Sequence, residues 1–197
     1  MATPSEPPPQ PWPDGEPLHA DLLAAKRLVY DPSGLVCTRP VPEAESVEYG
    51  AHGFTVDGSA VRFRVARTTP TKAGQFVTVW KRSAGGEPIR PYDSVDPVDL
   101  FVISTRDTGG FGQFVFPRDV LRERDIVSTG GSGGKRAFRV YPPWVTTSGR
   151  QAGRTQEWQV EYFLPVREGE AEGEGENEGK NEGEAVDPVR CRALYRP

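Results

Sequence analysis

Apolar residues recur at every second position over much of the chain, and this period limits the fold more than any other feature. Segments 53–57 (GFTVD) and 60–67 (AVRFRVAR) both alternate in this way. The two residues Gly58 and Ser59 separate them, which indicates a β-hairpin with a two-residue connection. The same alternation predicts strands at 75–82, 111–117 and 135–141.

One further segment, residues 98–104 (VDLFVIS), is apolar at almost every position. A strand of this kind is buried on both faces and lies in the interior of its sheet. Residues 111–117 (FGQFVFP) follow after the turn Arg106-Asp107-Thr108-Gly109-Gly110. We therefore expect residues 111–117 to pair with this central strand.

Three segments are predicted to be helices. Residues 17–30 place Leu18, Leu22, Ala25 and Val29 on one stripe, and residues 117–126 begin with proline and an early aspartate, both typical of a first helical turn. Residues 148–164 combine strand-like alternation near their end with many helix formers, and a helix is the preferred interpretation. Together these patterns predict an α/β fold with a single mixed sheet and flanking helices.

Composition divides the chain into three parts. Residues 1–16 are rich in proline and are expected to be a disordered leader. Residues 167–197 begin with alternating glutamate and glycine, which cannot build a core, and are expected to be a flexible acidic tail. The domain expected between them, residues 17–166, carries 19 Lys or Arg and 16 Asp or Glu, whereas the whole chain has a net charge of −4. The body is thus mildly basic and the tail acidic.

The two cysteines and the apolar segments exclude several classes of protein. Cys37 and Cys191 lie far apart and fit neither a zinc-binding spacing nor a disulfide framework. No apolar run approaches the ~20 residues that a membrane helix needs, and the N-terminus has no signal-peptide pattern. We expect a soluble, cytoplasmic protein without membrane contact.

Basic residues recur along the predicted strands, with aromatic residues between them. Cations beside aromatic side chains are typical of proteins that contact phosphates and stack bases. The alternative is a solvated sheet edge with the tryptophans in the core. The candidate nucleic-acid-binding residues are Arg62, Arg64, Lys72, Lys81, Arg82, Lys135, Arg136 and Arg139.

Asp99 and Gln113 form a second candidate site. Metal-dependent nucleases often place an acid at the start of one strand and Glu-x-Lys on its neighbour, where the acids hold Mg²⁺ and the lysine positions water. In this chain Asp99 begins the central strand, but Gln113 and Val115 stand where a glutamate and a lysine are needed. Asp99 is the only candidate metal ligand of this pair, and a plain turn residue after Asp96-Pro97 is the alternative.

Five long motifs resemble the MepB family. They are FRVARTTPTKAGQFVTVWKR (63–82), PVDLFVIS, FGQFVFPRDVL, GKRAFRVYPPW and RQAGRTQEWQVEYF, and the resemblance covers about residues 40–165. It implies a restriction-endonuclease-like α/β fold and association with DNA, with no established catalytic activity. Where the family tends to have lysine before Thr-x-Pro, this chain has Arg67, which keeps the positive charge.

Three functions remain open from the sequence. The first is a DNA-binding protein that contacts the backbone with little sequence selectivity and needs no cofactor. The second is a Mg²⁺-dependent nuclease with a degenerate metal site, and the third is a protein-interaction module built on the tryptophans. The acidic tail is a candidate for an intramolecular contact with the basic groove, because a tethered anionic segment competes with DNA at high effective concentration. A solubilising segment without such a contact is the alternative.

Overall fold

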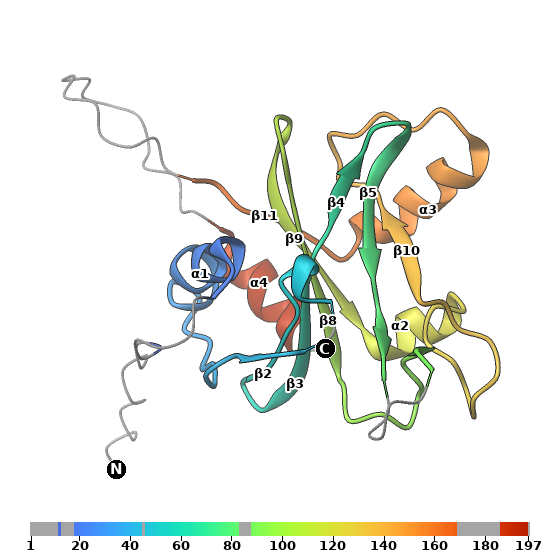
Figure 1. Ribbon diagram of the computed structural model, residues 1–197. Coiled ribbons are helices and arrows are strands. Elements are labelled where there is room, and N and C mark those ends of the chain that lie inside the picture. The colour runs from blue at the N-terminus through green and yellow to red at the C-terminus, as the bar shows by residue number, and fades with distance from the viewer. Residues whose placement is uncertain (1–11, 13–17, 45, 83–87, 169–185, 197) are drawn as a thin grey trace, which may run out of the picture.

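The computed structural model describes residues 12, 18–44, 46–82, 88–168 and 186–196, and it is drawn in Figure 1. Except for Trp12, the expected leader lies outside these residues, as does the acidic stretch 169–185. The described helices are α1 (Ala20–Ala25), the π-helical turn η1 (Lys26–Tyr30), the 3₁₀ turn η2 (Val47–Tyr49), α2 (Arg118–Glu123), α3 (Arg150–Val160) and α4 (Pro188–Tyr195). The strands are β1 (Val41–Pro42), β2 (His52–Val56), β3 (Ser59–Val65), β4 (Arg67–Thr69), β5 (Lys72–Thr78), β6 (Trp80–Lys81), β7 (Arg90–Pro91), β8 (Leu100–Asp107), β9 (Gly110–Pro117), β10 (Ala137–Val140) and β11 (Phe163–Pro165).

A six-stranded sheet in the order β1-β2-β3-β8-β9-β11 forms the centre of the protein. Its strands pair antiparallel except for β3 and β8, which run parallel. Strand β8 lies between β3 and β9 and is buried along most of its length, so the predicted central strand and its pairing with residues 111–117 are confirmed. The sheet is thus mixed, as expected.

The hairpin of β2 and β3 turns one residue earlier than the sequence suggested. Ser59 already pairs with Val56, and the two turn residues are Asp57 (φ 47°) and Gly58 (φ 85°). A two-residue hairpin turn of this hand needs positive φ at both positions, which glycine adopts freely and aspartate tolerates.

The prediction of a single sheet is wrong. Strand β5, expected to follow the hairpin in the same sheet, belongs instead to a separate three-stranded sheet in the order β10-β5-β4, and β6 pairs with β7 as a two-stranded ribbon. The chain leaves the large sheet after Ala66, whose N–H is the last to bond β8, and β4 begins at once in the smaller sheet. Alternation shows that a segment is a strand but does not say which strand it joins.

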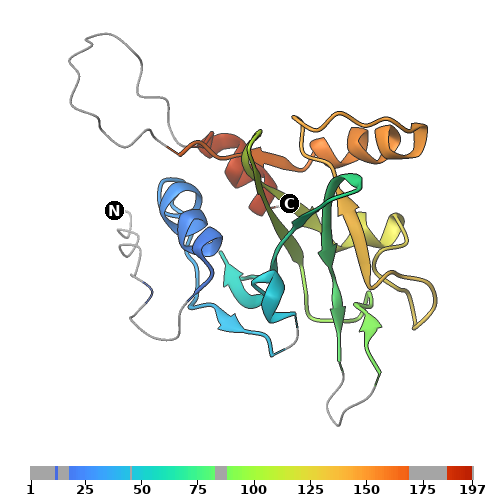
Figure 2. The same ribbon diagram turned by 45° about the horizontal axis from the view of Figure 1, so that its top comes forward.

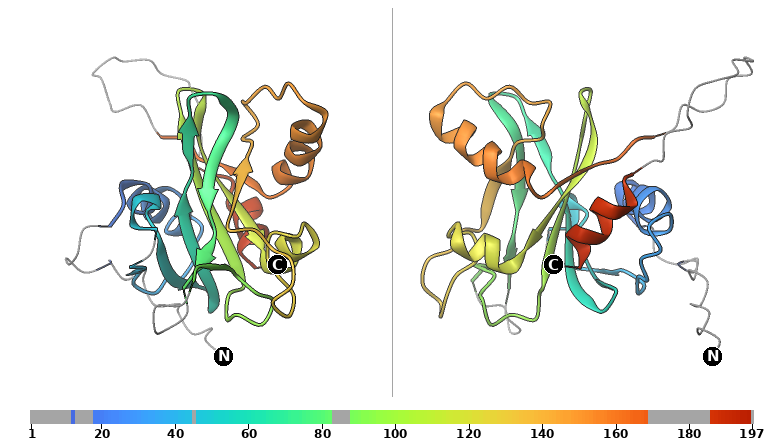
Figure 3. Two further views of the ribbon diagram at one scale, coloured as in Figure 1. Left: turned by 45° about the vertical axis from the view of Figure 1, so that its right-hand side comes forward. Right: turned by 180° about the vertical axis from the view of Figure 1, so that it is seen from behind.

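The six-stranded sheet is covered on both faces, as Figure 3 shows. One face packs against α1, η1 and α4 through a core that includes Leu22, Phe54, Val102 and Cys191. The other packs against the three-stranded sheet, α2 and α3, through residues such as Val77, Phe101, Phe116 and Leu121.

Helix α4 corrects the expected domain boundary at residue 166. Its side chains Cys191 and Tyr195 are fully buried in the first core, next to Val186. Asp187 caps the helix by accepting hydrogen bonds from the N–H groups of Val189 and Arg190. Residues 186–196 therefore belong to the folded domain and are not part of a flexible tail. Trp12 also packs against this core, with its ring 6.1 Å from that of Phe54.

The predicted helices agree with the structure. Residues 117–126 contain α2, and the preferred interpretation of 148–164 as a helix is confirmed by α3. Of the strand-like alternation near the end of that segment, only the last residues form a strand, the short β11, which pairs with β9. The stripe at 17–30 forms α1 and η1, with Leu22, Ala25 and Val29 buried.

Candidate nucleic-acid interface

A concave groove lies between α3 and the strands β5 and β10. These three elements lie on the right-hand side of Figure 2. Its volume is about 780 Å³. Among its lining residues are four cations, Lys72, Arg124, Lys135 and Arg139, and no aspartate or glutamate. Phe138, Tyr141 and Trp158 contribute aromatic surface.

A second hollow of about 400 Å³ continues this groove along α3. The two share Arg124, Gln151, Thr155 and Trp158, and the second adds Arg150 and Arg154. Together they form one surface, which we call the α3 trough, with six cations and no carboxylate in its lining.

The wall of the trough is held by the side chain of Gln159. This residue is fully buried, and its amide accepts a hydrogen bond from the N–H of Tyr141 and donates one to the carbonyl of Arg139, both at 2.9 Å. The amide thus continues the hydrogen-bonding edge of β10 and fixes α3 beside it. Gln156 adds two bonds to the carbonyls of Pro142 and Val145. The trough is therefore rigidly built, which a preorganised binding surface requires.

The cations of the α3 trough have no carboxylate partners in the described part of the chain. None of the six forms an ion pair there, and Arg139 is positioned instead by the carbonyls of Ala73 and Gly74 and by the hydroxyl of Thr69. The guanidinium of Arg124 lies 5.0 Å from the centre of the Trp158 ring, a cation–π contact. The N-terminus of α3 also has neither a side-chain cap nor an acidic residue in its first turn, which adds positive potential at this end.

Three of the other predicted cations line a separate pocket of about 520 Å³ next to β2 and β6. We call it the β2 pocket; it contains Arg62, Lys81 and Arg82 together with the acids Glu43 and Asp96. Lys81 pairs with Asp96, and Arg62 lies 3.4 Å from Glu43. The carboxylates offset most of the positive charge, so this pocket is a poor site for a polyanion.

Arg64 cannot contact DNA in this structure. Its side chain is 1% exposed and binds Glu43 at 2.5 Å, the hydroxyl of Tyr92 and its neighbour's carbonyl. Strand alternation placed Arg62 and Arg64 on the same face, which is correct, but that face is largely covered by the second layer. Arg136 is exposed and is not among the lining residues of the trough.

Asp99 and Gln113 do not come together. Asp99 is exposed, and its carboxylate accepts a hydrogen bond from the N–H of Ala60 at 2.8 Å, at the start of β3. In the register of β8 and β9, Gln113 pairs with Ser104, five residues beyond Asp99 and therefore roughly 16 Å along the strand. The two side chains share no site, and the described residues contain no group of three or more His, Cys, Asp or Glu that could hold a metal ion.

Gln113 has a structural role. It is fully buried and accepts a hydrogen bond of 2.9 Å from the hydroxyl of Tyr195 on α4. Burial raises the pKa of the Tyr195 hydroxyl well above its usual value, so the hydroxyl remains a donor. Burial also raises the pKa of the Cys191 thiol to about 11 and that of Cys37 to about 12, which keeps both thiols protonated at neutral pH.

The tryptophans favoured as a protein-docking surface are partly used by the fold. Trp144 is half-buried, packs 5.6 Å from the Phe163 ring and lies against the turn at Gly109. Trp80 is half-buried in the β6–β7 ribbon. They do not form a shared exposed patch with Trp158, which lies in the trough.

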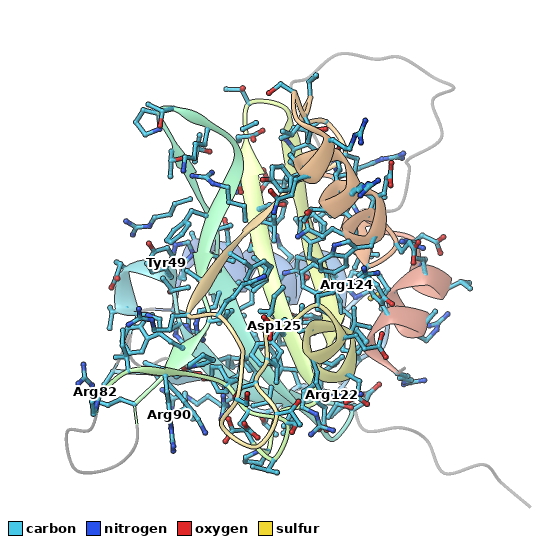
Figure 4. All side chains as sticks on the ribbon, turned by 90° about the vertical axis from the view of Figure 1, so that its right-hand side faces the viewer. Tyr49, Arg82, Arg90, Arg122, Arg124 and Asp125 are labelled. Carbon is cyan, nitrogen blue, oxygen red and sulfur yellow. The ribbon has the colours of Figure 1, made fainter. Side chains whose placement is uncertain are left out.

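Sequence reasoning missed Arg124 and the grouping of Arg150, Arg154 and Trp158. The grouping of Arg150, Arg154 and Trp158 could have been predicted, because residues at intervals of four along a helix share one face. No comparable pattern identifies Arg124, which reaches the trough only because α2 ends beside α3 (Figure 4).

These features define a mixed α/β protein with a six-stranded central sheet and a basic, aromatic trough on one side. The MepB-like family model matches residues 43–165, and the chain belongs to this family. A crystal structure of MepB is similar to it, with 33% sequence identity and a TM-score of 0.65 over 76% of this chain and 97% of that one. No curated protein matches the chain. No helix among the described residues is long and apolar enough to cross a membrane.

Proposed function

We propose that this protein binds DNA through its phosphate backbone, with little selectivity for sequence, and that the α3 trough is the interface. The observation that carries the proposal is the lining of the trough, which has six cations and no carboxylate. A polyanion gains free energy there by releasing counterions, and no acidic side chain of the lining has to be displaced first.

The type of cation supports contact with phosphates. Four of the six are arginines, Arg124, Arg139, Arg150 and Arg154, whose planar guanidinium groups match phosphate oxygens in pairs. The predicted residues Lys72, Lys135 and Arg139 belong to this interface. Arg62, Lys81 and Arg82 contribute at most to the long-range field, and Arg64 does not take part.

The restriction-endonuclease-like ancestry implied by the family resemblance is part of the proposal, with DNA contact retained and cleavage not required. Asp99 bonds the backbone of β3, and Gln113 is enclosed by α4. No further observation favours a nuclease over a binding protein. We therefore propose DNA as the partner and no cofactor.

Salt dependence tests the proposal. DNA affinity of the full chain is measured by fluorescence anisotropy at several salt concentrations. We expect log affinity to fall linearly with log salt, and neutralisation of about four to six phosphates predicts a slope of about −4 to −5 for duplex DNA. An affinity that does not change with salt would show that the trough is not a phosphate-binding surface.

A further inference from the structure

The contact between Arg124 and Trp158 leads to a more specific assignment of the ligand. The Phe116 ring, which is fully buried, lies 5.3 Å from the Trp158 ring and so occupies its inner side. Arg124 is exposed, and its guanidinium lies 5.0 Å from the same ring. The tryptophan thus lies between the core and an arginine, and the guanidinium of Arg124 is a planar group in the lining of the trough beside it.

Arg124 lies at the end of α2, where the two hollows of the trough meet. Its backbone N–H ends α2 by bonding the carbonyl of Val120, and its side chain has no carboxylate partner among the described residues. Arg124 also lines both hollows of the trough, so it stands where they meet. Its guanidinium carbon lies 5.0 Å from the centre of the Trp158 ring, and because the side chain is exposed, the part of the guanidinium that faces away from Trp158 is accessible to a ligand.

Cations lie on both sides of this junction. Lys72, Lys135 and Arg139 line the larger hollow, and Arg150 and Arg154 line the smaller one. A nucleic-acid strand that crosses the junction would place phosphates near the cations of both hollows, and a base would lie between these phosphates, next to Arg124. Bases stack on arginine guanidinium planes as well as on aromatic rings.

We infer that the α3 trough takes single-stranded nucleic acid, with one base stacked on the outer surface of Arg124. This rests on the proposed function, because it assumes that the trough binds phosphates. In a duplex each base is stacked and paired with its neighbours, so a duplex cannot offer a base to Arg124 without first extruding it. In a single strand no base pair has to be broken before a base can stack on Arg124.

The experiment compares two single strands that carry the same charge with a duplex, which carries about twice as many phosphates. A thymidine oligonucleotide of about 12 nucleotides, an abasic strand of equal length and a duplex of equal length are titrated into the full chain. Because stacking of one base contributes about 5- to 150-fold in affinity, we expect the thymidine strand to bind at least fivefold more tightly than the abasic strand and more tightly than the duplex.

Two matched variants assign the effect to Arg124. Arg124→Lys keeps the positive charge and loses the planar group, so it should bind thymidine and abasic strands equally, with an unchanged salt slope. Arg150→Lys should keep the wild-type difference, because Arg150 contacts only phosphate. Both positions are exposed, so folding is preserved.

The outcomes separate the two proposals. Equal affinity of the wild type for thymidine and abasic strands, duplex binding as tight as single-strand binding, or an unchanged difference in Arg124→Lys would overturn the stacking inference while salt-dependent binding stands. Failure of all three ligands to bind in a salt-dependent way would overturn the proposed function itself. A ribose strand of uridines, run in parallel, shows whether RNA is accepted equally.

Discussion

The α3 trough and the β2 pocket contain the same kinds of residues and differ in how their charges are paired. In the β2 pocket Arg62 and Lys81 lie beside Glu43 and Asp96. In the trough, all the charged residues of the lining are cations. Figure 4 shows Arg124 beside α3 and Arg82 and Arg90 at a separate corner of the molecule. Both regions are rich in basic residues, but carboxylates are part of the lining in the β2 pocket and are absent from the lining of the trough.

The difference reflects what each region does for the fold. Glu43 follows β1 and joins Arg64 and Tyr92, which come from β3 and from the segment after β7, so this network fastens the second layer to the large sheet. The trough is fastened instead by uncharged groups, mainly the buried amide of Gln159. Of its charged side chains, Arg139 bonds backbone and hydroxyl groups of the neighbouring strands, but none of the six forms an ion pair with another described residue. Four variants test this difference.

The largest expected effect is on stability in the β2 region. Arg64→Ala leaves the Glu43 carboxylate in a partly buried site without its strongest partner, and loss of one member of a buried pair lowers the free energy of unfolding by about 3–5 kcal/mol. Chemical denaturation measures this directly. The matched change Arg150→Ala, at an exposed position in the trough, should alter stability by no more than about 0.5 kcal/mol. Equal losses would mean that the two regions do not differ in role.

The next effect is on DNA affinity. The triple variant Lys72→Ala, Arg150→Ala and Arg154→Ala removes three phosphate contacts, and we expect about a 100-fold loss, with a salt slope shallower by about 2 to 3. Its control removes three charges from the other region, Arg62→Ala, Lys81→Ala and Arg90→Ala, and should change affinity by less than about threefold. Anisotropy titrations at several salt concentrations measure both. A similar loss in the two triples would show that net charge alone determines binding.

The acidic stretch 169–185 is expected to have a smaller effect. In the sequence it begins three residues after Val166 and ends next to Val186, which are both part of the core that packs against α1 and α4, so truncation after Val166 would also remove α4. The appropriate change converts its seven glutamates to glutamine and keeps the length: Glu170, Glu172, Glu174, Glu176, Glu178, Glu182 and Glu184. If this stretch competes with DNA for the trough, affinity at low salt should rise about fivefold and the gain should shrink as salt increases. Equal affinities at low salt would leave the stretch without a competitive role.

The smallest effect tests whether the β2 pocket can be made to resemble the trough. Asp96→Asn keeps the side-chain carbonyl that accepts the N–H of Asp93 and releases Lys81 from its ion pair. One additional free cation should raise DNA affinity by about two- to threefold, with a slope steeper by less than about 0.9. In the background of the trough triple variant, the same change should restore little binding, since Lys81 lies outside the trough. A large rescue would contradict the assignment of the interface.

Much of the fold follows from local pattern. The alternating segments are strands, residues 98–104 are central, and the three helical segments are helices, because side-chain period and turn residues act over a few neighbours. The family was also recognisable from its motifs, and the matched range 43–165 agrees with it. The Glu-Gly composition concealed the end of the domain, since α4 is only eight residues long and derives its stability from Tyr195 and Cys191 packing against distant strands.

The site shows the same division. Local pattern is enough to recognise Lys72, Lys135 and Arg139 as basic residues beside strands and aromatic residues. It does not reveal that Arg64 is buried against Glu43, that Lys81 pairs with Asp96, or that Arg124 lies against Trp158, because these contacts form only in the folded chain. A charge is available to a ligand only when no opposite charge lies within a few ångströms. Those neighbours come from parts of the chain 15 to 34 residues away, where the period of a strand or helix carries no information.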